Sequence, residues 1–550
     1  MRFWKRLFTL ILAAVMLFSV SGCGFLNYDT FSNAFDGHGS GGTKFGDMEY
    51  VHPEVDEIRS KVDSICDMLD SDAGYSDVAD ALDEFYTLYW NFYTMYTLAE
   101  IRSDLNTSDK YYGREYDYCS GEEANVTTMF TELMVACANS SLSAKLDSRY
   151  FGGILAENYS GSYETGFEKL NSLYARESAL LTQYRSLLVE FYDCADQDEA
   201  YRTYNPDMCQ IYIDLVKVRR QIAEECGYSS YEEMAYEQFG REYSPDDIAE
   251  YIAAIKKYIV PLLSEARDSD ILSDAYYSLR DSEPEDSLAV VKAAVSSMDT
   301  TFSRSMDFME SCELYDISDS PNKLETSYVV YIDDYNAPFL FVKSTGYEED
   351  ILSIAHEFGH FTDSYENFDM NSNLDTSETL SQGMEYMLLC NLSSKKLASR
   401  LTDYKMTDTL FLYSNQGCFN EFEHRVFALP ESELTVDKVN SIYAECALEF
   451  GFGDDYGDVL GLSWIDVSHF FDYPFYVISY CVSDSAAFSM YCMELDKAGS
   501  GLDTYLRVLD DAENMDFLEL LDSAGMGSPI TADTIKEIAE VIADKLELSA

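Results

Sequence analysis

One pair of histidines constrains this chain more than any other feature of its sequence. The 550 residues include six histidines, and His356 and His360 lie four positions apart around Glu357. On a helix, residues i and i+4 share one face, so both imidazoles could bind a single metal ion. Glu357 would lie about 100° further round the helix, where it could polarise a metal-bound water. Two histidines on a helix surface with a charge between them are the plainer alternative.

A third metal ligand is expected among the acidic residues that follow. Catalytic zinc sites often combine two His with one carboxylate and keep a further position open for water or substrate. Glu378 follows His360 by 18 positions, which leaves room for a loop and the first turn of a returning helix. Glu385 lies seven positions later on nearly the same helix face, so we expect it to hydrogen-bond a ligating imidazole. Asp375 and Glu385 are rival ligands, and a solvated helix surface is the alternative for each acid alone.

These motifs resemble those of a known family. The run PFLFVKSTGYEEDILSIAHEFGH (338–360), followed by ETLSQGME (378–385), resembles the thimet oligopeptidase and oligoendopeptidase F family of zinc metallopeptidases. That family shows Glu-x-x-Ser-x-x-x-Glu after its His-Glu-x-x-His, and ETLSQGME matches this order. The stretches 227–251 (GYSSYEEMAYEQFGREYSPDDIAEY) and 469–480 (HFFDYPFYVISY) agree as well. The resemblance extends from about residue 200 to residue 530.

The resemblance implies both a fold and a reaction. The expected fold is mostly α-helical, a two-lobed zincin metallopeptidase with a deep central cleft and a small β element beside the His-Glu-x-x-His helix. One Zn²⁺ would be held by His356, His360 and Glu378, and Glu357 would act as general base on the zinc-bound water. The substrates would be oligopeptides, cut at internal bonds inside a channel that excludes folded proteins.

By the same resemblance, three residues further along would line the cleft and stabilise the oxyanion of the tetrahedral intermediate. These are His469, Tyr476 and Tyr480, and Tyr473 could also serve. Hydrogen-bond donors aimed at developing charge supply much of the rate in such reactions. Aromatic packing beside a loop is the alternative for each tyrosine.

Two other functions stay open. An aminopeptidase of the membrane-alanyl type has similar ligand spacing, but its Gly-Ala-Met-Glu-Asn segment is absent from this sequence. A lipoprotein that binds peptide or zinc without turnover is the other alternative, and Glu357 argues against it because capture does not need a general base.

The N-terminus reads as a targeting signal. Residues 1–22 begin with three basic residues and continue with an apolar run over 7–20 that is short for a membrane span. The run ends in Val-Ser-Gly-Cys, which resembles a bacterial lipobox with Cys23 as the acylated mature N-terminus. An ordinary signal peptide or an uncleaved anchor is the alternative. We expect a flexible tether over 23–50 and a protein lipid-anchored to the outer face of a bacterial cell membrane.

Apolar spacing predicts helices almost throughout 53–311 and again towards the C-terminus. We expect an N-terminal helical region over 51–200 and a catalytic domain over 201–550. Runs at 328–332 and 338–342 predict a hairpin or two edge strands. The predicted helices are 55–69, 78–105, 167–192, 208–225, 230–239, 245–266 with a kink at Pro261, 374–390 capped by Thr376 or Ser377, 408–428, 435–450 and 484–497, with a loop-like segment at 463–483.

Charge and cysteine content exclude several functions. The formal net charge of −63 predicts repulsion from nucleic acid and from anionic lipid headgroups. The thirteen cysteines include no Cys-x-x-Cys, so thiolate zinc sites and thioredoxin-like chemistry have no support. Many of these cysteines lie in apolar helical stretches, where Cys behaves as a small core residue.

Overall fold

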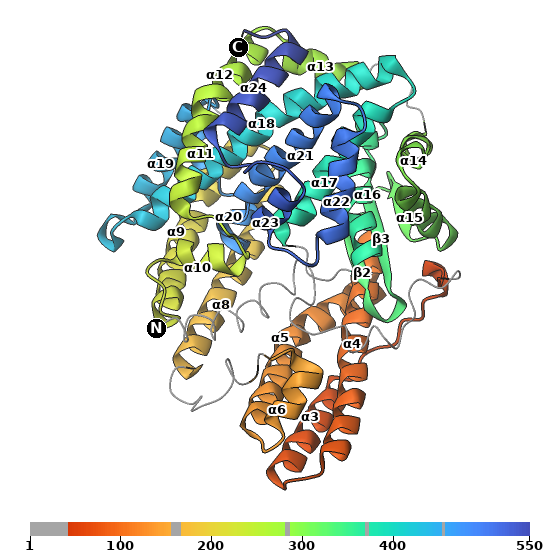
Figure 1. The fold of residues 1–550 in the computed structure, drawn as a ribbon. Coiled ribbons are helices and arrows are strands. Elements are labelled where there is room, and N and C mark those ends of the chain that lie inside the picture. The colour runs from red at the N-terminus through yellow and green to blue at the C-terminus, as the bar shows by residue number, and fades with distance from the viewer. Residues whose placement is uncertain are drawn as a thin grey trace. The chain divides into compact units, whose positions relative to one another are not determined.

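The computed structural model describes residues 42–153, 155, 167–280, 286–368, 373–453 and 457–549 (Figure 1). The chain forms two compact units, and each is built from two separate stretches of sequence. The first unit contains Met1–Ser162 and Pro284–Ser372, and the second unit contains Tyr163–Glu283 and Asn373–Ala550. The described residues are mostly helical with one small sheet, which confirms the predicted fold class.

The first stretch of the first unit is a set of helices packed side by side: α3 (Val55–Asp70), α4 (Tyr75–Leu105) and α5 (Lys110–Asn139) (Figure 1). The aromatic run of α4 is buried among them, as its apolar character on all sides predicts. Phe85 of α4 stacks on Phe130 of α5, with ring centroids 6.0 Å apart. Burial of such a ring stabilises a fold by about 1.5–3 kcal/mol relative to exposure. The shorter elements here are η1 (Phe45–Asp47), α6 (Ser143–Leu146) and η2 (Asp147–Phe151).

The second stretch of the first unit carries the sheet, whose strand order is β1-β3-β2. β2 (Ser327–Ile332) and β3 (Ala337–Lys343) form the predicted antiparallel hairpin. β1 (Tyr315–Ser318), which the sequence did not predict, pairs in parallel with the other side of β3. The alternative of two edge strands is therefore wrong for β3, which lies between two partners and is almost wholly buried. α14 (Ser287–Met298) and α15 (Thr300–Ser311) precede the sheet, and η3 (Asp333–Tyr335) joins β2 to β3.

α16 (Asp350–Asn367) follows β3 and packs against β2 and β3. The carboxylate of Asp350 fixes the connecting loop. It accepts hydrogen bonds from the hydroxyl of Ser344 (2.6 Å), from the backbone N–H and hydroxyl of Thr345 (both 2.8 Å) and from the N–H of Gly346 (3.0 Å). A carboxylate in the first turn also interacts favourably with the helix dipole. The start of α16, and with it the direction of every later side chain on this helix, is thus set by local hydrogen bonds.

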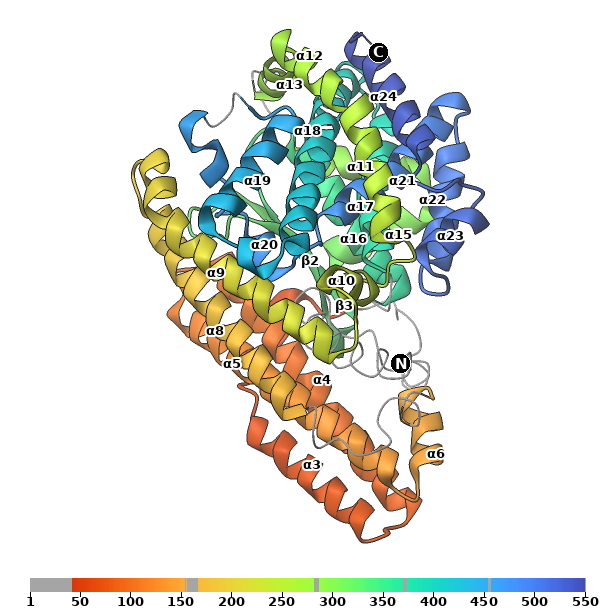
Figure 2. The ribbon, with the colours of Figure 1, turned by 90° about the vertical axis from the view of Figure 1, so that its left-hand side faces the viewer.

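The second unit begins with two long helices, α8 (Phe167–Tyr192) and α9 (Gln197–Glu225), which run side by side (Figure 2). The bounds of α8 are as predicted. α9 begins earlier than the predicted start at Met208 and contains Pro206. Its first turn is capped by Asp196, whose side chain accepts a hydrogen bond from the N–H of Glu199 at 3.1 Å.

The predicted helix start at Ser244 is confirmed by a capping box. The N–H of Asp247 donates to the Ser244 hydroxyl (3.2 Å), and the N–H of Ser244 donates to the Asp247 carboxylate (2.8 Å). The predicted kink at Pro261 is instead a break at Ile259, because proline is favoured in the first turn of a new helix and disfavoured inside an old one. The helices of this region are α10 (Tyr231–Gln238), α11 (Pro245–Tyr258), α12 (Val260–Asp268) and α13 (Ile271–Arg280).

The interior of the second unit is formed by α17 (Leu374–Asn391), which packs along α21 (Ile478–Asp496), and by α18 (Lys395–Ala428) (Figure 1). Gly383 of α17 permits a close approach, since a Cβ there would lie 3.0 Å from the ring of Tyr505. The remaining elements are η4 (Glu431–Glu433), α19 (Val436–Glu449), η5 (Gly457–Leu462), α20 (Ser468–Asp472), α22 (Ser500–Asp511), α23 (Phe517–Ser523) and α24 (Ala532–Leu546).

Two predictions about this unit are wrong in detail. α17 is capped by Asn373, whose side chain accepts a hydrogen bond from the N–H of Asp375 at 2.8 Å, and not by Thr376 or Ser377, which lie inside the helix. The segment 463–483 is not simply a loop, since it contains α20 and the first turns of α21. Buried aromatic residues stabilise helix there although the local pattern does not favour it.

The predicted signal peptide and Cys23 lie outside the described residues. Among the helices of residues 42–549 that the structure describes, none is both long and apolar enough to cross a membrane. The twelve cysteines within the described ranges are all free thiols, and eight of them are buried, as their apolar surroundings predict.

Candidate metal centre

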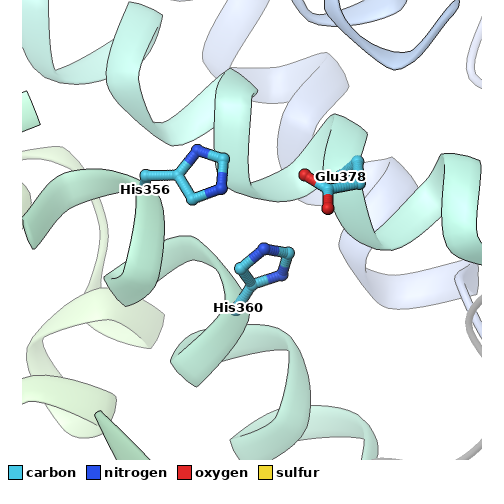
Figure 3. A group of neighbouring side chains, drawn as sticks. All are labelled: His356, His360 and Glu378. Carbon is cyan, nitrogen blue, oxygen red and sulfur yellow. The ribbon is translucent and has the colours of Figure 1, made fainter. Parts of the chain in front are cut away.

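Three of the predicted residues come together. The imidazoles of His356 and His360 on α16 and the carboxylate of Glu378 on α17 form a group whose possible ligand atoms all lie within 4.8 Å of one another (Figure 3). The two imidazole rings, one helical turn apart, have centroids separated by 5.0 Å. Glu378 is the acid of α17 that joins this group, and the rival ligands Asp375 and Glu385 do not belong to it.

The donor set suits a divalent metal ion such as zinc, which prefers imidazole nitrogen and carboxylate oxygen in such sites. Burial, together with the neighbouring His356, holds the pKa of His360 well below its usual value. His360 therefore carries a neutral imidazole with a lone pair available for a ligand bond near pH 7. Glu378 is 7% exposed, and the hydroxyl of Ser381 donates to its backbone carbonyl at 3.0 Å and lies 3.3 Å from Oε2. These residues fit a zinc ion.

Glu357, the predicted general base, lies on α16 beside the first histidine and is 6% exposed. The apolar residues of the same helix, including Ile351, Ile354 and Phe358, are completely buried. They anchor α16 from one side and leave both histidines only partly covered. The helix therefore presents its three polar residues from a rigid, buried support.

The two rival acids of α17 have other partners. Asp375 is 1% exposed and accepts a hydrogen bond from the hydroxyl of Tyr243 at 2.8 Å. Glu385 forms an ion pair with Lys405, whose Nζ lies 2.8 Å from its Oε2. The hydrogen bond expected between Glu385 and a ligating imidazole stays a prediction.

The predicted oxyanion residues lie together in the second unit. The ring of His469 on α20 lies 5.6 Å from Tyr476 and 6.4 Å from Tyr480, and the two tyrosine rings are 5.4 Å apart. Tyr473 joins the cluster with its ring 6.2 Å from Tyr476. Burial, with contributions from Tyr480 and Glu378, holds the pKa of Tyr476 well above its usual value, so its phenol keeps its proton. Burial also lowers the pKa of His469, which favours the neutral imidazole.

The other two described histidines lie elsewhere. His424 pairs with Glu232 at 3.0 Å, and that hydrogen bond raises the pKa of His424. His52 lies 2.6 Å from Glu115 in the entry segment of the first unit. Neither residue belongs to the metal group.

Sequence reasoning missed the buried ionisable residues around this region, notably Lys405, Arg241 and Glu423. One of them carried a signal. Lys405 lies on α18 four residues after Leu401 and four residues before Thr409, and both of these neighbours are completely buried. Residues four apart share one face of a helix, so this spacing predicts that Lys405 also lies on the buried face.

The fold is that of solved oligoendopeptidase structures. PZ peptidase A in complex with an inhibitor matches with a TM-score of 0.73 and 21% identity, over 92% of this chain and 99% of that chain. A Bacillus anthracis strain Ames protein assigned as an oligoendopeptidase F matches with a TM-score of 0.67 and 20% identity, over 92% and 99% of the two chains. Oligoendopeptidase-F from Enterococcus faecium matches with a TM-score of 0.57 and 15% identity, over 90% and 97%.

A family comparison agrees with the fold. Residues 45–160 match the model of the Peptidase M3 N-terminal domain. Among curated proteins, none matches this sequence significantly. The domain match and the shared fold together confirm the resemblance to the oligoendopeptidase F family and support an M3-family peptidase.

Proposed function

We propose that this protein is a zinc-dependent oligoendopeptidase that hydrolyses internal bonds of short peptides. The observation that carries the proposal is the group of His356, His360 and Glu378, whose donor atoms suit zinc. The match of residues 45–160 to an M3 peptidase domain supports the same activity.

His356, His360 and Glu378 would hold the zinc ion. When bound, zinc supplies Lewis acidity, which polarises the scissile carbonyl and makes a nearby water easier to deprotonate. A neutral His360 favours binding, because a protonated imidazole has no lone pair to offer.

Glu357 would accept a proton from the attacking water and deliver it to the nitrogen of the departing amine. General acid–base catalysis of this kind contributes about 10²–10⁴-fold to the rate. The buried position of Glu357 restricts competition from bulk water.

Tyr476, Tyr480 and His469 would donate hydrogen bonds to the negative oxygen that develops as the carbonyl carbon becomes tetrahedral. A phenol with a raised pKa keeps its proton at neutral pH, so Tyr476 remains a donor throughout turnover. Tyr473, in contact with Tyr476, is the alternative donor.

We also propose that the protein acts at the outer face of a bacterial cell membrane, where an acyl chain on Cys23 would hold it. The proposal rests on the basic and apolar residues that precede Cys23 in the sequence. Mass spectrometry of the protein extracted from membranes tests it: an acylated Cys23 at the mature N-terminus is expected, and recovery of the unmodified chain from cytosol contradicts it.

The activity is tested with internally quenched peptides and analysis of the product ends. We expect internal cleavage that a chelator stops and added zinc restores. Glu357→Gln should lower kcat by about 10²–10⁴-fold while zinc binding is retained. Glu366→Gln is the matched control, since Glu366 lies on the same helix but pairs with Arg304 at 3.0 Å.

Two outcomes would contradict the proposal. Release of single N-terminal residues would indicate an aminopeptidase. Zinc-loaded protein that binds peptides and cleaves none would indicate a binding protein.

A further inference from the structure

The segment that carries the tyrosine cluster contains a strained residue. Phe475, between α20 and α21, has φ = 65°, in the left-handed region that residues with a Cβ rarely adopt. Its ring is completely buried, and it packs 5.0 Å from the ring of Phe427. Such strain persists only where the surroundings over-determine it, and it is common at functional sites.

Both backbone polar groups of Phe475 are bound by buried side chains, the carboxyl of Glu423 and the guanidinium of Arg241. Its N–H donates to Oε2 of Glu423 at 2.9 Å, and its carbonyl accepts from Nη2 of Arg241 at 2.8 Å. Glu423 is 1% exposed and Arg241 9% exposed. The two hydrogen bonds fix the left-handed turn from both sides, and the one from the guanidinium is charge-assisted and therefore roughly twice as strong as a neutral one.

Arg241 holds more than this one residue. The same Nη2 lies 3.3 Å from the carbonyl of Tyr476 and donates to the hydroxyl of Ser479 at 2.8 Å. The rings of Tyr236 and Phe239 cover the guanidinium, with centroids 4.6 and 4.9 Å from Cζ. Aromatic faces attract a cation and keep water away from it. Arg241 thus binds the turn that orients Tyr476 and the first turn of the helix that carries Tyr480.

The charge of Arg241 is matched by Asp375, in the first turn of α17. The two groups attract each other, which opposes the effect of burial on the carboxyl, and Tyr243 donates to Asp375 at 2.8 Å. Asp375 precedes Glu378 by three residues, so it lies on nearly the same face of α17. The positive charge of Arg241 therefore couples the helix turn that presents Glu378 to the turn that presents the tyrosines.

We propose that Arg241 is a positioning residue that fixes Tyr476 and Tyr480 relative to Glu378, through the strained turn at Phe475 on one side and Asp375 on the other. The inference rests on the proposed peptidase function for the roles of those three residues. Arg241 touches no reacting atom and acts only by holding the groups that do.

The guanidinium is the chemical feature that the arrangement uses. The planar group, covered by the rings of Tyr236 and Phe239, aims Nη2 at the turn in a fixed direction, whereas a lysine ammonium is a point charge on a flexible stem. Arg241→Lys should therefore keep the charge opposite Asp375 and lose the alignment of the turn, and Arg241→Met should lose both.

The experiment compares Arg241→Met and Arg241→Lys with Arg220→Met in the full-length protein. Arg220 is a matched control because it is partly buried in the same unit and also donates to two backbone carbonyls, those of Val426 and Phe427 at 3.1 and 2.8 Å. Each variant is measured for kcat and KM with a quenched peptide, for zinc affinity by competition with a chelator, and for its melting temperature.

We expect Arg241→Met to lower kcat at least about tenfold more than Arg220→Met does, with KM changed by less than about threefold. Zinc affinity should fall about tenfold in Arg241→Met and remain unchanged in Arg220→Met. Arg241→Lys should keep most of the zinc affinity and still lose kcat. Combining Arg241→Met with Tyr476→Phe should cost less than the product of the two single losses, because both remove the same interaction.

The inference is overturned if Arg241→Met lowers only the melting temperature and matches Arg220→Met in kcat, KM and zinc affinity. It is also overturned if the losses of Arg241→Met and Tyr476→Phe simply multiply. Should Arg241→Met not fold, Arg241→Lys decides by the same comparison. If the wild-type protein cleaves no peptide, the proposed function fails, and the zinc affinities still decide whether Arg241 positions Glu378.

Discussion

The N-terminal helices of the first unit and the central helices of the second unit fill their interiors in different ways. Among α3, α4 and α5 the buried cluster consists of apolar and aromatic side chains such as Phe85 and Phe130. Among α17, α18 and α21 the interior also holds an ion pair. Lys405 lies 2.8 Å from Glu385 and 3.9 Å from Asp484, and each of these side chains is at most 9% exposed.

The difference shows where the chain buries charged groups, whose loss of hydration destabilises the fold. Removing a methylene or a ring from water is favourable wherever it happens, so an aromatic cluster is stabilised if its side chains pack closely. A buried charge loses its hydration, and its partners must restore that loss with good geometry. The charged interior lies in the helix that carries Glu378 and in its neighbours, where side-chain position matters more than stability.

The largest expected effects come from removing one interior side chain from each of the two regions. Lys405→Met should lower the free energy of unfolding by about 3–5 kcal/mol near pH 8, because it leaves two carboxylates buried without a cation. Phe85→Ala should cost a similar amount, about 3–5 kcal/mol, through the cavity it leaves. Urea unfolding at several pH values distinguishes the two mechanisms.

The pH dependence follows from the acids that remain. Burial raises the pKa of Asp484 to about 6 even with Lys405 present. Without Lys405 its pKa rises further, so at pH 5 Asp484 binds a proton and the missing cation matters less. The cost of Lys405→Met should therefore shrink between pH 8 and pH 5, while that of Phe85→Ala stays constant. An equal cost of Lys405→Met at both pH values would contradict the buried ion-pair account.

A medium effect is expected where the first unit departs from its apolar pattern. Among the described residues, no cation compensates the burial of Glu123 on α5, and this burial raises the pKa of Glu123 from 4.5 to about 7. Between these pH values the folded protein keeps a proton that the unfolded chain has lost, so stability falls as pH rises through this window and stays low above it. At pH 8 the free energy of unfolding of Glu123→Gln, measured by urea unfolding, should therefore exceed that of wild type by about 1–2 kcal/mol.

At pH 4 the two proteins should be alike, because the carboxyl is then protonated in both the folded and the unfolded state. A gain at pH 4 as large as the gain at pH 8 would mean that packing of the amide, and not charge, explains the difference. This result would sharpen the comparison, since it separates an unpaired buried acid in the first unit from the paired acids of the second.

The smallest effect concerns neither interior. Ser244→Ala removes the capping box of α11 and should lower the melting temperature by an amount that corresponds to about 1 kcal/mol, at any pH at which Asp247 is ionised. Ser441→Ala, at an exposed position inside α19, is the control and should be neutral or slightly stabilising. If both variants lost the same stability, the cap would contribute nothing.

The sequence by itself determined the features that depend on neighbours along the chain. The four-residue spacing of His356 and His360 places both on one face of any helix they share. The run of aromatic residues in α4 predicted burial, and the Ser-Pro-Asp-Asp start of α11 predicted a cap, because each rule involves only a few consecutive residues.

Only the tertiary structure decided among the three acids of α17. Asp375, Glu378 and Glu385 all lie in one helix, and helical spacing alone does not show which of them meets the histidines. Their partners decide it: Tyr243 binds Asp375 from 132 positions away, and Lys405 binds Glu385. What remains is Glu378 beside the two imidazoles.

The same reason explains why the sequence did not predict β1 and why it did not show that each unit is built from two separate stretches of the chain. A four-residue strand is stabilised mainly by its parallel pairing with β3, and each unit by contacts between stretches far apart in the chain. The spacing of residues along the chain does not predict which distant segment a strand or helix will contact. The left-handed turn at Phe475 is the clearest case, since its conformation is unfavourable locally and is held by Glu423 and Arg241, two buried side chains that only the folded chain brings to it.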